Sequence, residues 1–183
     1  MEAKGYEIRS GADLAGADLV DADLRAADLS NAHLAGAVMS SADLSGACLI
    51  GADLRYAICH RTILADADLH HANLWNVDLT DARAEGAVLS RCRMGNARLV
   101  ATDLRRADLG GAWVTAADLT GAMLRPVLWP APHSPELVFE KLTSPGPLLS
   151  GWTFGVESST VPLCGPRTLA APISGARRLS KLT

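Results

Sequence analysis

Residues 12–31 read ADLAG-ADLVD-ADLRA-ADLSN, and this five-residue frame continues without an insertion as far as residue 126. The third position of each unit runs in steps of five from Leu14 to Leu124, which makes 23 units. Of these, 18 carry Leu at the third position and 19 carry Ala two positions earlier. A repeat of this regularity predicts a solenoid in which every unit adds the same structural step.

Ala and Leu favour helices, but the period of five argues against one. At about 100° per residue, a five-residue step would turn successive Leu side chains by about 140° and scatter them around a helix. Within a unit, Ala and Leu lie two positions apart, on one side of an extended segment. The residue between them then points outward and is Asp in 11 of 23 units, and the last two positions are rich in Gly, Ser, Asn and Asp. These residues favour corners, so each unit is predicted to be an extended triplet followed by a corner.

The units resemble the A(D/N)LXX consensus of the pentapeptide-repeat family over about residues 10–126. This resemblance implies an all-β fold, a right-handed quadrilateral β-helix with four units, or 20 residues, in each coil. At a strand spacing of about 4.8 Å, the 23 units would make a rod about 28 Å long. The expected core ladder along its axis comprises Leu14, Leu19, Leu24, Leu29, Leu34, Leu44, Leu54, Leu69, Leu74, Leu79, Leu99, Leu104, Leu109 and Leu119.

The composition changes where the repeat ends, because all nine prolines lie between residues 126 and 172. The expected organisation is an N-terminal lead-in over 1–11, the β-helix over 12–126, a C-terminal cap with a short helix over 127–142, and an irregular or disordered tail over 143–183, rich in Pro, Gly and Ser.

The helix is expected in the cap because Ser134, Pro135 and Glu136 form a typical N-cap and first turn. A solenoid must cover its open last coil, and open strand edges invite pairing. We therefore expect this end to form a homodimer contact as well. The residues expected at the cap and dimer contact are Val127, Leu128, Trp129, Leu137, Val138 and Leu142.

The charge differs between the two halves of the repeat. Residues 10–69 carry nine Asp and three Arg, whereas residues 70–126 carry six acidic residues and seven Arg. A 20-residue coil would stack five acid–arginine pairs in the second half: Asp78–Arg98, Arg98–Asp118, Arg61–Asp81, Arg83–Asp103 and Glu85–Arg105. The candidate acidic interaction surface comprises Asp13, Asp18, Asp21, Asp23, Asp28 and Asp43. Two interpretations stay open: the surface meets a basic partner, or the aspartates only solvate the exterior and bond to backbone donors at the corners.

Several functional classes fit poorly. The net charge of −3 argues against a polybasic nucleic-acid binder, so no direct nucleic-acid contact is expected. No apolar run approaches the length of a membrane span, and residues 1–11 have no apolar signal-peptide core, which predicts a cytoplasmic protein without membrane contact. Four scattered cysteines form no zinc-site spacing, and the histidines give no convergent metal site, so neither cofactor nor metal is expected. No catalytic constellation is evident, which predicts that the protein is not an enzyme.

The favoured function is a non-enzymatic scaffold or protein-interaction module whose partner is unknown. The alternative, implied by the family resemblance, is a DNA mimic that binds DNA gyrase and protects it from quinolones or toxins. Trp75 and Trp113 are predicted to point outward from one face, either as an interaction patch or as cover for Leu-rich edges.

Overall fold

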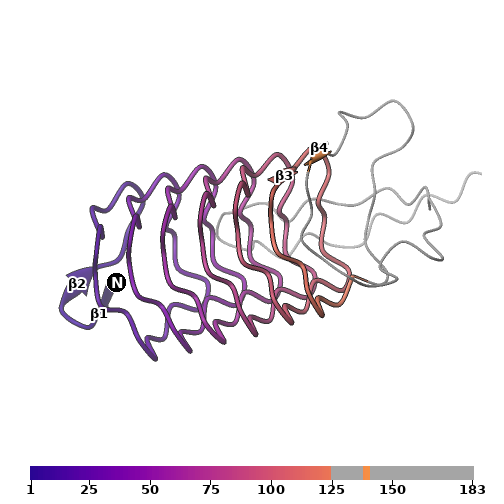
Figure 1. Cartoon of the computed structure of the whole chain (residues 1–183). Helices are drawn as coiled ribbons and strands as arrows, with labels where there is room; N and C mark the ends of the chain where they lie inside the picture. The colour runs from indigo at the N-terminus through magenta and orange to yellow at the C-terminus, as the bar shows by residue number, and fades with distance from the viewer. Residues whose placement is uncertain (125–137, 141–183) are drawn as a thin grey trace, which may run out of the picture.

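The computed structural model describes residues 1–124 and 138–140, and Figure 1 shows the chain winding through successive coils of a right-handed β-helix. Nineteen isolated parallel bridges each join the middle residue of a unit to the residue 20 positions later, from Asp13–His33 to Asp103–Met123. This uniform step confirms the prediction of four units per coil. We number the faces by the first four units, so the first face starts with Asp13 and the fourth with Asp28.

Backbone hydrogen bonds on both sides of each middle residue hold neighbouring coils together. The Leu14 amide donates to the carbonyl of His33 at 2.8 Å, and the His33 amide donates to the carbonyl of Ala12 at 2.9 Å. The same pattern recurs along the rod. A parallel ladder with only one bridged residue per unit and face explains why the repeat contains isolated bridges in place of long strands.

A tight turn forms the corner of each unit. The amide of Ala17 donates to the carbonyl of Leu14 at 3.0 Å, and the turn's third residue, Gly16, has a φ of 66°. The equivalent residue has a positive φ in all 22 units whose fifth residue the structure describes, from Gly16 to Gly121, which is what a type II turn requires. This explains the enrichment of Gly, Asn and Asp at the last position of the repeat.

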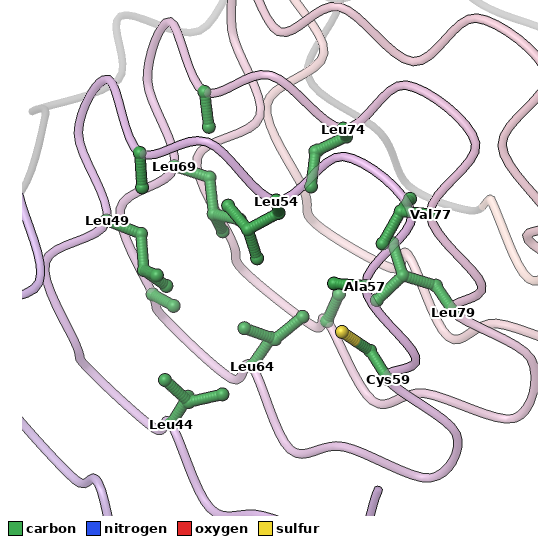
Figure 2. Close-up of a cluster of buried hydrophobic side chains, with 14 of the residues drawn as sticks. Leu44, Leu49, Leu54, Ala57, Cys59, Leu64, Leu69, Leu74, Val77 and Leu79 are labelled. Carbon is green, nitrogen blue, oxygen red and sulfur yellow. The ribbon is translucent and has the colours of Figure 1, made fainter. Parts of the chain in front are cut away.

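The interior is filled by the first and third residues of each unit. All 14 leucines of the core ladder are at most 5% exposed. In Figure 2, Leu44, Leu64 and their neighbours extend from successive coils into the space that the coils enclose. Burial of each Leu contributes roughly 1.5–3 kcal/mol before the loss of chain entropy is subtracted.

Threonine replaces the interior Ala at two positions without leaving its hydroxyl unpaired. The hydroxyl of Thr62 donates to the carbonyl of Met39, and that of Thr102 donates to the carbonyl of Leu79, both at 2.8 Å. Since a buried hydroxyl is costly only when it lacks a partner, these units keep the coil geometry.

The N-terminal end carries a small hairpin, in which β1 (Glu2–Ala3) pairs antiparallel with β2 (Tyr6–Glu7). At the other end, β3 (Trp113–Thr115) pairs in parallel with β4 (Val138–Glu140), and Trp113 lies opposite Val138 (Figure 1). β4 therefore adds a rung to the first face after a step of 25 residues.

The predicted short helix is wrong for Val138–Glu140, because these residues form strand β4. A strand can pair with the open backbone edge of β3, whereas a helix satisfies its backbone groups internally and leaves that edge unpaired. The remaining expected cap and dimer residues lie outside the described residues, and so does the tail over 143–183. These cap and dimer residues are Val127, Leu128, Trp129, Leu137 and Leu142.

Candidate functional site

The aspartates of the repeat have a structural role at the corners. All eleven that occupy the middle position accept a hydrogen bond at Oδ1 from the backbone amide two residues later, at 2.9–3.3 Å. Asn73 does the same for the amide of Trp75, at 3.3 Å. The carbonyl-type oxygen that Asp and Asn share is therefore sufficient for the corner, which explains why Asn73 can take the place of Asp in its unit.

Five aspartates form an acidic belt around the first coil: Asp13, Asp18, Asp21, Asp23 and Asp28. All five are exposed, and together they reach all four faces. Within the described residues, the second carboxylate oxygen of Asp13, Asp18 and Asp28 makes no hydrogen bond or ion pair, so the belt presents these charges to solvent. Asp43, the sixth residue of the candidate surface, is half-buried and bridges Asp23 from the next coil.

One member of the belt is neutralised by an arginine of its own unit. The guanidinium of Arg25 holds Asp23 through two hydrogen bonds, of 2.6 Å to Oδ2 and 2.8 Å to Oδ1, and lies 4.0 Å from Asp43. The hydrogen bonds from Arg25 lower the pKa of Asp23 to about 2. The net negative charge of the belt is therefore carried by the other four aspartates.

In two other units with the sequence Asp-Leu-Arg, the aspartate and the arginine of the same unit also form an ion pair. Arg55 lies 2.7 Å from Asp53, and Arg105 lies 2.7 Å from Asp103. In both cases the arginine's hydrogen bond is the main cause that lowers the pKa of the aspartate. Sequence analysis missed these pairs, although the triplet was visible.

The predicted pairs between coils form only in part. Asp78 and Arg98 are 3.4 Å apart, and Glu85 and Arg105 are 3.6 Å apart. In the described coils, the other three predicted pairs, Arg98–Asp118, Arg61–Asp81 and Arg83–Asp103, are not within ion-pair distance. For Arg83–Asp103, the competing partner is Arg105, which binds both carboxylate oxygens of Asp103 from two residues away.

Along the described coils, the outward acidic residues do not form long rows: only Asp23 is followed directly by another acid, Asp43, and Ile63 comes next in that stack. On the first face Asp13 is followed by His33 and Asp53, and on the second face Asp18 is followed by Val38 and Ile58. The belt is thus a ring at one end of the helix and not a stripe along it.

The first face also carries a shallow hollow of about 610 Å³, which we call the aromatic hollow. Six of its lining residues are Tyr56, Asn73, Trp75, Arg93, Trp113 and Thr115. The side chains of Tyr56 and Trp113 are both 61% exposed and Trp75 is 42% exposed. The prediction that both tryptophans point outward from one face is confirmed, whereas Tyr56 and Arg93 were missed.

The position of Trp75 depends on a glycine one coil later. Its indole ring lies against Gly95, where an added Cβ would collide with the ring. The backbone of Arg93 bridges Asn73 on one side and Trp113 on the other, so Arg93 belongs to the coil between the two that carry Trp75 and Trp113. In the described part of the chain, Arg93 makes no ion pair.

The surroundings of Arg93 are basic. Partial desolvation lowers the pKa of His71, and the nearby charges of His70, Arg91 and Arg93 lower it further. From Asn73 to Thr115, the outward positions of the first face hold no acidic residue. Of the two arginines that line the hollow, Arg55 is paired with Asp53 and Arg93 makes no described ion pair, so the hollow combines apolar rings with one arginine charge that no described acid compensates.

Two histidine contacts lie elsewhere on the rod. His60 Nε2 is 2.9 Å from Asp78 Oδ2, and His70 Nδ1 is 2.7 Å from the hydroxyl of Ser90. Neither histidine lines the hollow, and sequence analysis missed both contacts.

Among residues 1–124 and 138–140, no group of three or more His, Cys, Asp or Glu side chains is arranged to hold a metal ion. The described residues include no helix with the length and apolar character needed to span a membrane.

Comparison with known proteins settles the family. The family described as "Pentapeptide repeats (8 copies)" matches residues 17–55, 47–83, 62–99 and 85–121. The chain belongs to the pentapeptide-repeat family. These matches run from residue 17 to residue 121, more than half of the chain, and agree with the resemblance seen in the sequence. No curated protein matches the chain.

Solved pentapeptide-repeat proteins resemble parts of the rod. HetL of Nostoc sp. strain PCC 7120, which is involved in heterocyst differentiation regulation, is 35% identical, with 63% of this chain and 60% of HetL covered and a TM-score of 0.41. Rfr23 of the cyanobacterium Cyanothece 51142 is 26% identical, with coverages of 56% and 60% and a TM-score of 0.38.

QnrB1, a plasmid-mediated fluoroquinolone resistance protein, is 20% identical, with coverages of 74% of this chain and 76% of QnrB1 and a TM-score of 0.34. The chain spans about 60% of the length of Rfr23 and of HetL.

Proposed function

We propose that this protein is a non-enzymatic interaction module whose acidic belt binds a basic surface of a partner protein. The belt carries the proposal because its charge exceeds what the fold requires. Asn73 shows that an amide satisfies the corner amide as an aspartate does. Four unpaired carboxylates on one coil also repel one another, so the fold gains nothing from their charge. Such a surface attracts and orients a basic partner.

A DNA mimic would need charges in rows along the rod, in the manner of the phosphates of a duplex. The stacks that begin at Asp13 and Asp18 are interrupted at the next coil by His33 and Val38. A belt at one end is better suited to a compact basic surface than to a DNA-binding channel. This arrangement gives no support to the gyrase alternative. The homodimer contact through residues 126–142 and the cytoplasmic location stay predictions.

The test compares two variants with the same change in charge. The belt variant carries Asp13→Asn, Asp18→Asn, Asp21→Asn and Asp28→Asn, and the control carries Asp66→Asn, Asp81→Asn, Asp108→Asn and Asp118→Asn. None of these eight residues is in a described ion pair. An arginine-rich peptide serves as the basic probe in calorimetric titrations at low and high salt.

We expect the wild type and the control to bind this peptide at low salt, and the belt variant to bind about tenfold more weakly. Binding should fall as salt rises, because exposed charges are screened within about 8–10 Å. Equal weakening in both variants would show that total charge, and not the belt, attracts the peptide, and would contradict the proposal.

A second measurement addresses the gyrase alternative directly. DNA gyrase supercoiling is followed with increasing amounts of the wild type and of the belt variant. We expect no inhibition by either protein. Inhibition by the wild type that is lost in the belt variant would establish gyrase as the basic partner and favour the alternative function.

A further inference from the structure

We propose that the aromatic hollow is a binding site for a nucleotide, with the base stacked on an indole ring and the phosphate held by Arg93. This site is separate from the acidic belt and independent of the function proposed for it. It is also a local feature, so it is compatible with the acidic charge of the whole chain, from which no nucleic-acid contact was expected.

The first argument is the concentration of exposed rings. Among the described residues, six large hydrophobic side chains are exposed, and three of them, Tyr56, Trp75 and Trp113, line this one hollow. Exposed aromatic rings are costly to hydrate and offer flat faces, on which each stacked base contributes about 1–3 kcal/mol. The volume of about 610 Å³ lies within the range of small-molecule sites.

The second argument is the unpaired cation. Two arginines line the hollow, and Arg55 is already held by Asp53 at 2.7 Å. Other arginines of the described coils also lack an ion pair, but of these only Arg93 lies among the exposed rings. Arg93 has Asn73 and Trp113 as its bridge partners and makes no ion pair in the described coils. A guanidinium that shares a hollow with aromatic rings and lacks a carboxylate partner is complementary to a phosphate, which it can bind through two parallel hydrogen bonds.

The third argument is that the hollow has a fixed shape. Trp75 lies against Gly95, and any side chain at that position would displace its ring. Thr115 belongs to β3, whose backbone is held by pairing with β4 on the next rung. The carboxamide of Asn73 is fixed by the hydrogen bond that its oxygen accepts from Trp75, which leaves its NH₂ group as a donor on this face. The hollow is therefore organised before a ligand arrives.

The experiment uses the fluorescence of the full chain with Trp129→Phe and Trp152→Phe, so that only Trp75 and Trp113 emit. The probes are adenosine monophosphate, adenosine, inorganic phosphate and a short oligothymidylate. We expect saturable quenching by the monophosphate, weaker binding of adenosine and no quenching by phosphate. If the oligothymidylate binds more tightly than the monophosphate, the ligand of the hollow is a nucleotide within single-stranded nucleic acid. If it binds equally or more weakly, the ligand is a free nucleotide.

Three variants test the assigned contacts. Arg93→Gln should lower the affinity for adenosine monophosphate about tenfold and leave the affinity for adenosine unchanged, because only the phosphate contact is lost. Gly95→Ala should lower the affinity for both ligands, because the added methyl group displaces the ring of Trp75. Arg106→Gln, which removes another arginine without a described ion pair, is the matched control and should change neither affinity. Circular dichroism checks that each variant keeps the fold.

Two results would overturn the proposal. One is the absence of saturable quenching by both the monophosphate and the oligothymidylate at millimolar nucleotide. The other is an equal loss of affinity in Arg93→Gln and Arg106→Gln, which would mean that general charge attracts the nucleotide and that the hollow does not hold it.

Discussion

The first coil and the later coils of the first face have the same backbone but opposite surfaces. In the first coil, outward positions hold the aspartates of the belt, and only Asp23 has an arginine partner. On the first face after residue 70, outward positions hold Trp75, Arg93 and Trp113, without an acid among them. Both regions have a 20-residue step, the same corner turn and a buried interior of Ala and Leu.

This contrast separates the positions that build the rod from those that are free to vary. The first and third residues of a unit are constrained by the interior, and the fifth by a positive φ. The second and fourth residues mostly point outward. An Asp or Asn at the second position binds the corner amide, but His33, Val38 and Ile58 occupy the same position in other units, so these positions tolerate different side chains. Two binding surfaces of opposite chemistry can therefore exist on one continuous core.

The largest expected effect comes from breaking that shared core. Leu69 lies between the two regions and is fully buried. Leu69→Lys would place an unpaired charge on the axis, which costs several kcal/mol and is comparable with the whole stability of a small domain. We expect loss of the cooperative thermal transition by circular dichroism, and with it loss of both surfaces. Leu69→Met is the control and should cost less than about 1.5 kcal/mol. A wild-type transition in Leu69→Lys would contradict the buried position of this residue.

A smaller effect should follow from removing a corner hydrogen bond in either region. Asp18 of the belt accepts from the Val20 amide at 3.1 Å, and Asp108 of a later coil accepts from the Gly110 amide at 2.9 Å. We expect Asp→Ala at each position to lower the free energy of unfolding by about 1 kcal/mol, and Asp→Asn to lower it much less. Urea unfolding measures the difference. If Asn were as damaging as Ala, the charge itself would be structural, and the belt's charge would no longer be in excess of the needs of the fold.

Most of the fold was predictable because a short period constrains every coil alike. The spacing of Ala and Leu identifies the buried side, and the 20-residue step predicts the neighbouring positions of Asp78 and Arg98, which lie 3.4 Å apart. The strand over Val138–Glu140 was not predictable in this way, because it lies beyond the last repeat and pairs with β3 after a 25-residue step. Local signals at Ser134 and Pro135 favoured a helix, and the open edge of β3 explains why a strand forms instead.

The surfaces were only partly predictable. The outward direction of Trp75 and Trp113 follows from the frame, but the contact of Trp75 with Gly95 depends on a side-chain rotamer that no period specifies. Likewise, the frame places Asp23 and Asp43 in one stack, yet it does not show that Arg25 prefers the carboxylate of its own unit. These contacts depend on the length and rotamer of individual side chains, which the repeat period does not specify.

The smallest expected effect is a change in the pKa of Asp23, and it distinguishes Arg25, which is paired with Asp23, from Arg93 of the hollow, which makes no described ion pair. The hydrogen bonds of Arg25 lower the pKa of Asp23 from its ordinary 3.8 to about 2. Because the pKa is lower in the folded state, this pair stabilises the protein above pH 3.8, and its contribution is lost as the pH falls toward 2. In Arg25→Gln, we expect the midpoint of the Asp23 carboxyl, followed by NMR, to rise toward 3.8. Arg93→Gln should leave this midpoint unchanged, since Arg25, and not Arg93, lowers the pKa of Asp23. A midpoint that stays near 2 in Arg25→Gln would show that the backbone amide at the corner, and not the guanidinium, holds the charge of Asp23.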